Sequence, residues 1–142
     1  MEIAANASLP TSETARLLEA LVARTFETPK HEWRALSVAF ETSGAEFGFG
    51  SRGYFYDARG EWEAAPHVPD ERMPDDVIES WIRASYATAG PWRECMIHII
   101  RDLRARITFE FEDIERWGVP DDGRHLGDIF RPAEISTPIK RP

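Results

Sequence analysis

The stretch Trp92–Trp117, WRECMIHIIRDLRARITFEFEDIERW, has the pattern of a β-hairpin. In each half, apolar residues recur at every second position, which is the periodicity of a strand with one buried face. Because both apolar sets should share that face, we expect these facing pairs: Cys95 with Phe111, Ile97 with Phe109, and Ile99 with Ile107. The turn has no glycine, so we expect a five-residue loop over residues 101–105 in place of a three-residue loop.

Length and composition are those of a single domain with its own hydrophobic core. The chain has 142 residues, of which 42% are hydrophobic and 11% aromatic. Residues 1–10 lack the basic start and apolar run of a signal peptide, and no run of about 18 apolar residues could span a membrane. The single cysteine, Cys95, excludes an internal disulfide, and we expect it to be a buried core residue. These features indicate a cytoplasmic protein.

The net charge is −8, and it is unevenly distributed along the chain. Residues 41–90 hold ten acidic and four basic residues, so six of the eight excess negative charges lie in the middle. Such a surface repels nucleic acid and acidic membranes, and it speeds association with a basic protein. The charge therefore favours a basic protein partner.

The rest of the chain contains two amphipathic helical patterns and several short strand patterns. One helix is expected from Thr11 or Ser12 to Phe26, and the other from Asp75 to Thr88. The expected strands before the hairpin are 33–40, 45–51, 54–56 and 61–63, and the glycines leave open whether 45–56 is one strand or two.

Two four-residue turns, 41–44 and 57–60, set the expected register of these strands. Each turn ends in a glycine, which can adopt positive φ. The expected pairings are Phe40 with Ala45, Val38 with Phe47, Leu36 with Phe49, and Phe55 with Trp62. The second turn then directs Tyr54, Tyr56, Glu61 and Glu63 to one side of the sheet.

This order of elements predicts a two-layer α+β domain. We expect an antiparallel sheet of about five strands, formed by a meander and the C-terminal hairpin, with two helices on one face. The other face should be open, with Met96, His98 and Ile100 on it. The domain is expected to span residues 1–117, and 118–142 should be a proline-rich tail with one short docked turn near Leu126, Ile129 and Phe130.

Motifs of catalysis and of cofactor binding are weak in this sequence. Residues 48–53 match G-x-G-x-x-G, but the strand-forming residues 54–56 follow where a dinucleotide site needs a helix. The four histidines are scattered and form no metal-ligand spacing, and the aspartates near residue 121 lack the spacing of a calcium loop. We therefore expect no catalytic residue, no cofactor and no bound metal.

Acidic residues interleaved with aromatic residues suit recognition of a basic protein, because the rings anchor the contact and the charges steer it. An ordinary solvated acidic surface explains the same pattern equally well. The candidate partner-binding residues are Tyr54, Tyr56, Asp57, Glu61, Glu63, Asp70, Asp75, Asp76, His98, Glu110 and Glu112.

Three segments of the chain, with a helix between the last two, resemble the YezG-type immunity proteins of bacterial polymorphic toxin systems. The segments are HEWRALSVAFETSGAEFGF, GEWEAAPHVPDE and PWRECMIHIIRDLRARITFEFEDIERW. The resemblance covers residues 31–117, and its most specific part is the strand Phe109–Asp113 ahead of a tryptophan. It implies a cytoplasmic α+β protein without enzymatic activity that binds and neutralises a cognate toxin, often a nuclease. This chain departs from that pattern at the Asp102-Leu103 turn, at residues 48–56 and in its longer tail.

The first functional hypothesis is therefore an immunity protein that binds a basic toxin domain and has no reaction of its own. The alternative is a small acidic chaperone or adaptor that holds a partner segment on the open sheet face, where Met96 and Ile100 offer apolar contact. A third possibility is an enzyme that uses His98, Glu110 and Glu112.

Overall fold

The computed structural model has an α+β fold. It describes residues 1–26, 32–42, 49–65, 75–113, 116–118 and 122–135. In chain order the elements are β1 (Glu2–Ala5), α1 (Thr11–Phe26), β2 (Ala35–Thr42), β3 (Phe49–Tyr56), β4 (Trp62–Ala64), α2 (Asp75–Ala89), β5 (Glu94–Ile100), β6 (Arg104–Glu110) and α3 (Leu126–Ile129). No helix within these ranges has the length and apolarity needed to cross a membrane.

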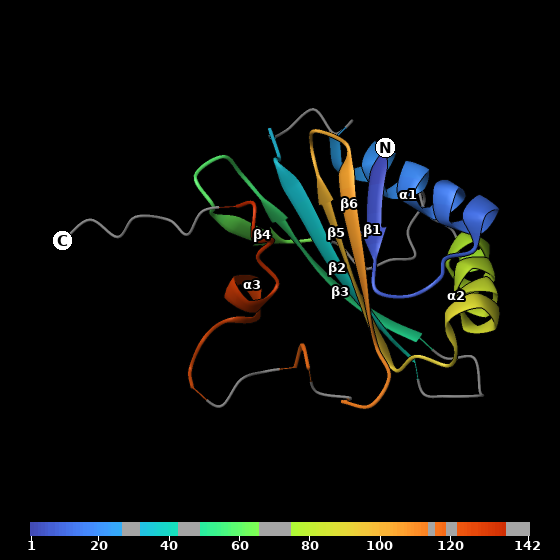
Figure 1. Ribbon diagram of the computed structural model, residues 1–142. Coiled ribbons are helices and arrows are strands. Elements are labelled where there is room, and N and C mark those ends of the chain that lie inside the picture. The colour runs from blue at the N-terminus through green and yellow to red at the C-terminus, as the bar shows by residue number, and fades with distance from the viewer. Residues whose placement is uncertain (27–31, 43–48, 66–74, 114–115, 119–121, 136–142) are drawn as a thin grey trace.

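The six strands form one mixed sheet in the order β1-β6-β5-β2-β3-β4 (Figure 1). The predicted α+β class is confirmed, but the expectation of a purely antiparallel sheet is wrong because β1 pairs in parallel with β6. The segment that forms β1, EIAA, is short and lacks the alternation that identifies a strand. Asn6 follows it and continues the edge, since its side-chain amide bonds to both the backbone N–H and the carbonyl of Phe109.

Helices α1 and α2 cover the first face of the sheet, as the apolar stripes predicted. Their bounds agree with the expected helices to within a residue. Leu17 and Leu21 of α1 and Trp81 of α2 are fully buried against the sheet, and the Trp81 indole N–H donates to the Thr14 hydroxyl at 3.1 Å. Cys95 lies in this core, and burial raises the pKa of its thiol, so the prediction of a buried cysteine is confirmed.

The β5–β6 hairpin keeps the predicted faces but not the predicted register. Cys95 faces Phe109, not Phe111, and the loop has three residues, 101–103, where five were expected. Leu103 closes this loop with φ of +68°, a conformation that costs an ordinary residue about 1–2 kcal/mol. In the observed register Ala105 pairs with Ile99 and is buried. A shift of two residues leaves every side chain on its face.

The pairing of β2 with β3 also differs from the prediction. Phe40 faces Ser51 and Leu36 faces Phe55, so β3 is one continuous strand, Phe49–Tyr56. The expected partners Ala45 and Phe47 lie outside the described residues. Pairing with the later part of β3 places Phe55 in the core, where the Trp33 ring stacks on it at a centroid distance of 5.1 Å.

The pairing of β4 with β3 is shifted by one residue from the prediction, and this changes the side of every β4 side chain. Trp62 faces Tyr56, and Glu63 faces Phe55. The turn closes by a bond from the Asp57 N–H to the Glu61 carbonyl, and Gly60 takes a φ of +83°. Tyr54 and Tyr56 are therefore separated from Glu63 by the sheet, contrary to the expectation that they share one side.

The second face of the sheet is covered and not open, which corrects the prediction. The described part of the C-terminal segment, residues 116–118 and 122–135, packs on it, and α3 lies on the opposite side of the sheet from α1 and α2 (Figure 1). Met96 is 1% exposed and Phe130 is fully buried. The expected docked turn is helix α3. This helix lies so close to β4 that a Cβ on Gly127 would lie 2.4 Å from the Trp62 ring.

Candidate functional site

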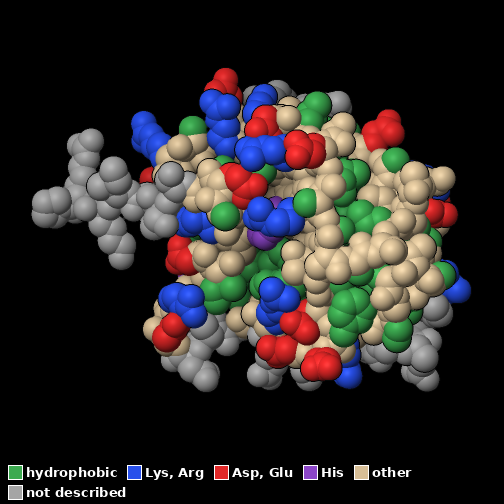
Figure 2. Space-filling model, viewed as in Figure 1, with side chains coloured by type: hydrophobic (Ala, Val, Ile, Leu, Met, Phe, Trp, Pro, Cys, Tyr) green, Lys and Arg blue, Asp and Glu red, His purple; other side chains and the backbone are tan. Residues whose placement is uncertain are grey.

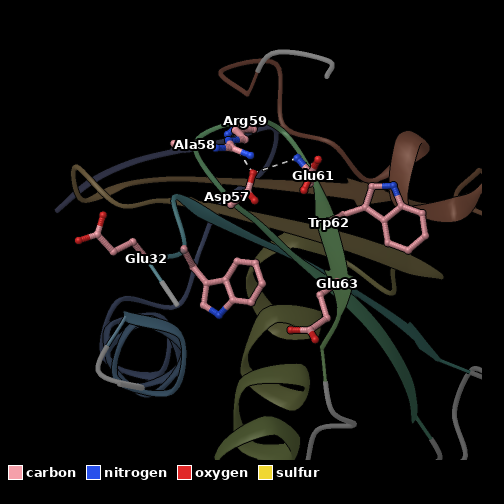
Figure 3. Close-up of a pocket in the computed structure, with 8 residues that line it drawn as sticks. Glu32, Asp57, Ala58, Arg59, Glu61, Trp62 and Glu63 are labelled. Carbon is pink, nitrogen blue, oxygen red and sulfur yellow. Dashed lines mark hydrogen bonds between the residues drawn. The ribbon is translucent and has the colours of Figure 1, made fainter. Parts of the chain in front are cut away.

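A pocket with a volume of about 440 Å³ lies at the end of the sheet where β3 turns into β4 (Figure 3). Its lining residues come from the segment before β2, from the turn and from β4: Glu32, Trp33, Asp57, Ala58, Arg59, Glu61, Trp62 and Glu63. Glu32 lies across the pocket from Glu61 and Glu63 in the close-up. We call this site the acidic pocket, because its described lining residues include four carboxylates and one guanidinium.

The turn that carries the acidic pocket is held in place by hydrogen bonds. Asp57 Oδ1 accepts the backbone N–H groups of Arg59 and Glu61 at 2.9 and 3.0 Å, and the Gly60 N–H donates to the Asp57 carbonyl (Figure 3). From the C-terminal segment, the Arg131 guanidinium donates to the Gly60 carbonyl. The carboxylates at this end of the sheet are thus positioned by a fixed backbone.

The electrostatics of the acidic pocket suit a cation. Glu32, Glu61 and Glu63 are exposed, so their charges face solvent, while Trp33 is 8% exposed and supplies an aromatic wall. Exposed carboxylates beside an aromatic ring can contact a lysine or arginine side chain through charge and through the ring face. Elsewhere the charge is mixed: on the face shown in Figure 2, basic and acidic side chains are interspersed.

The structure brings three of the candidate residues, Asp57, Glu61 and Glu63, together in the acidic pocket. Tyr54 and Tyr56 lie elsewhere, on the second face, where they are 8% and 0% exposed. The Tyr56 hydroxyl donates to the Gly127 carbonyl at 2.5 Å, and burial raises the pKa of both tyrosines. The expectation that these two rings are exposed anchors is therefore wrong, because the C-terminal segment covers them.

A second group of acidic residues lies at the opposite end of the sheet, where Glu41, Glu94 and Glu110 face one another on neighbouring strands. We call this group the carboxylate row. Glu94 is 3% exposed, its Oε2 accepts the Trp117 N–H at 3.3 Å, and its Oε1 has no hydrogen-bond partner among the described residues. Burial raises the pKa of Glu94, because the charged carboxylate is poorly solvated there.

Two candidate residues, Glu110 and Glu112, lie at this end of the sheet. Glu110 accepts the backbone N–H groups of Glu112 and Asp113 and bonds to Arg116, and these bonds hold the pKa of its carboxyl below the usual range. Glu112 is exposed. Neither residue lines the acidic pocket.

His98 is a mostly buried residue in the middle of β5, on the second face. Its Nδ1 lies 2.7 Å from the Ser37 hydroxyl, with which it forms a hydrogen bond. Burial, and then the neighbouring Arg106 charge, lower the pKa of His98 to about 4, so the ring is neutral at pH 7. His98 and the carboxylate row are separated by about 13 Å along the strand, so the structure does not assemble His98 with Glu110 and Glu112.

Of the remaining candidates, only Asp76 has a described side chain. Asp76 of α2 is exposed and its carboxylate is 3.9 Å from the Arg16 guanidinium of α1. Asp70 and the side chain of Asp75 lie outside the described residues. Among the residues that are described, no three His, Cys, Asp or Glu side chains are arranged to hold a metal ion.

The glycine-rich motif has a backbone role where it is described. Gly50 and Gly53 lie inside β3, and the strand continues after Gly53 with no helix opening there. A Cβ on Gly53 would lie 3.0 Å from the Ser37 carbonyl, so glycine lets β3 approach β2. The described part of the motif therefore lies within a strand, as the strand-forming residues 54–56 indicated.

Sequence reasoning missed Glu32, Trp33 and Arg59 as lining residues of the acidic pocket. The available signal was the pair Glu32-Trp33, which lies directly before a strand. Whether this pair lies opposite the β3–β4 turn depends on the register of β2 with β3. No protein family model and no curated protein matches the chain. Function is therefore inferred from the residues and their geometry.

Proposed function

We propose that this protein is a cytoplasmic immunity protein that binds and neutralises a cognate toxin domain with a basic surface, most readily a nuclease. The acidic pocket carries this proposal, because it combines exposed carboxylates, an aromatic wall and a fixed turn. The net charge of −8 and the resemblance of residues 31–117 to YezG-type immunity proteins support it.

In this proposal a lysine or arginine side chain of the toxin enters the acidic pocket. The carboxylates of Glu61 and Glu63 face its charge, and the other acidic residues of the surface steer the approach. A nuclease domain is basic where it holds phosphates, so an acidic protein that occupies that groove blocks the substrate. The inhibitor needs no catalytic group for this action.

The apolar surface that the chaperone or adaptor alternative requires is buried in the structure. Met96 and Ile100, the expected apolar contacts for a partner segment, are 1% and 8% exposed beneath the C-terminal segment. We therefore retain the toxin inhibitor as the proposed function.

Co-expression with the toxin domain encoded next to the gene tests the proposal. The chain should restore growth, and Glu61→Lys or Glu63→Lys should weaken binding by about tenfold or more, because each places a like charge against the toxin. Glu19→Lys is the matched control: this exposed residue of α1 gives the same net charge at a distant position. Absence of protection, or equal loss in the control, would contradict the proposal.

A further inference from the structure

The C-terminal segment contacts the residues directly before and after Glu61, one of the carboxylates of the acidic pocket. The residue before it, Gly60, bonds to Arg131, and the residue after it, Trp62, stacks on His125. Trp62 also lines the acidic pocket, and in the close-up its ring points away from the other lining residues and toward α3 (Figure 3). The segment therefore holds the chain on each side of a carboxylate that we assign to binding.

Arg131 makes the contact with Gly60. Its guanidinium donates to the Gly60 carbonyl, lies 5.4 Å from the centre of the Tyr56 ring and pairs with Asp128 at 3.1 Å. The Arg131 side chain is only 8% exposed. A charged donor held between an aromatic ring and a carboxylate has little freedom to move, so its hydrogen bond fixes the peptide group that joins Gly60 to Glu61.

The contact with Trp62 comes from the start of α3. The His125 ring lies 4.2 Å from the Trp62 ring, with an angle of 19° between the two planes. Nδ1 of His125 accepts the Gly127 N–H at 3.0 Å, so the residue that caps α3 also stacks on Trp62. Because stacked rings are held at a set distance and orientation, this contact fixes the first residue of β4.

The hydrogen bonds within the turn hold it less firmly than these two contacts. Asp57 Oδ1 accepts the N–H groups of Arg59 and Glu61, but both bonds are exposed to solvent and compete with water. Strand β4 has three residues and lies at the edge of the sheet, so its pairing with β3 adds little rigidity. The position of Glu61 therefore depends on the C-terminal segment as well as on the turn.

We propose that Arg131 is a positioning residue of the acidic pocket, an inference that rests on the proposed function, and that docking of the C-terminal segment favours binding of the basic partner. When the segment is undocked, Glu61 lies on a short, exposed edge, and the partner has to order the turn as it binds. The charge of Arg131 acts in the opposite direction, because a positive charge beside the acidic pocket repels a basic partner. Positioning and charge can therefore be separated by experiment.

Arg131→Gln in the full chain tests this inference, because positioning and charge predict opposite results. Loss of the positive charge alone should tighten binding of the toxin domain encoded next to the gene. Loss of positioning should instead weaken binding about tenfold, and hydrogen exchange of the Glu61 amide should become about tenfold faster. Arg124→Gln is the matched control, because it removes the same charge from an exposed arginine of the same segment that bonds to Asp122. It should leave the exchange unchanged and should not weaken binding.

His125→Asn is a second variant that separates stacking from capping, because asparagine also caps a helix. His125 is exposed, so the variant should fold, and loss of the stack should change the Glu61 exchange and the binding by about threefold each. Unchanged exchange of Glu61 in both variants, or faster exchange with unchanged binding, would overturn the inference. Absence of binding by the unmodified chain would refute the proposed function, whereas the exchange rates would still decide whether the segment holds the turn.

Discussion

The two faces of the sheet are both covered, but they are held together in different ways. On the first face, α1 and α2 bury a cluster of aliphatic and aromatic side chains, and the buried hydroxyls of Thr14 and Ser85 accept hydrogen bonds from the indole N–H groups of Trp81 and Trp92. On the second face, the C-terminal segment buries a smaller apolar cluster together with polar and titratable groups such as His98, Glu94 and the Tyr56 hydroxyl. Buried polar groups stabilise only when they are paired and in the right protonation state.

This difference indicates where on the molecule a partner protein can bind. Because side chains of both faces are already used for packing, the proposed contact with a toxin lies at the rim, in the acidic pocket at the β3–β4 turn. The titratable groups on the second face also make the free energy of unfolding depend on pH.

The largest expected effect comes from removing one phenylalanine from each face. Phe109 on the first face is 1% exposed and Phe130 on the second is fully buried. Phe109→Ala and Phe130→Ala should each reduce the free energy of unfolding by about 3–5 kcal/mol, measured by urea denaturation. A loss of less than about 1 kcal/mol for Phe130→Ala would mean that the C-terminal segment is only loosely docked.

The next effect is a loss of stability in acid that arises from the second face. The pKa of His98 is lowered from 6.5 to about 4 in the folded protein, so the unfolded chain binds its proton more tightly. The His98 contribution is therefore complete above pH 6.5 and is lost as the pH falls to 4, by up to about 3 kcal/mol.

Urea denaturation at pH 7 and at pH 4.5 measures this loss. His98→Gln cannot be protonated, so the difference between the two pH values should be smaller in this variant than in the unmodified chain. Equal differences in both proteins would show that His98 does not titrate as its burial implies.

A smaller effect of opposite sign is expected at Glu94. Its folded-state pKa is raised by burial, so its contribution to stability is present in acid and is lost as the pH rises through that pKa. Glu94→Gln should therefore raise the free energy of unfolding by about 1 kcal/mol at pH 8 and change it little at pH 4. Thermal melts of both proteins across this range provide the test, and destabilisation by the variant at pH 8 would contradict it.

The smallest effect on stability is expected at the rim. Glu61 and Glu63 are exposed and take little part in packing, so Glu61→Gln and Glu63→Gln should change the free energy of unfolding by less than about 0.5 kcal/mol. Thermal melts check this. A large loss would show that these carboxylates hold the turn, and it would weaken their assignment to binding.

The first face could be predicted from the sequence, because its periodic patterns report local geometry. The stripe on α1 and the alternation of Cys95 and Ile97 each identify a buried side without knowledge of the partner. The strand registers could not be obtained in the same way. Leu103 shows why: local propensity disfavours a three-residue loop that ends in a leucine at positive φ, yet the structure has this loop.

The second face and the acidic pocket depend on contacts between distant segments. A short docked turn near Phe130 could be predicted from its apolar residues, but its contacts with Tyr54 and Trp62 have no local signal. The pocket was only partly predicted. Asp57, Glu61 and Glu63 were identified from charge, but a one-residue difference in the β3–β4 turn placed them away from the tyrosines that were expected beside them.

The rate of association with the toxin domain, measured by stopped flow as a function of ionic strength, tests the central claim most directly. The account predicts a rate that falls steeply with added salt, and Glu61→Lys and Glu63→Lys should lose much of that dependence while Glu19→Lys retains it. A rate that is unchanged between low and high salt, or an equal loss in Glu19→Lys, would contradict recognition through the acidic pocket.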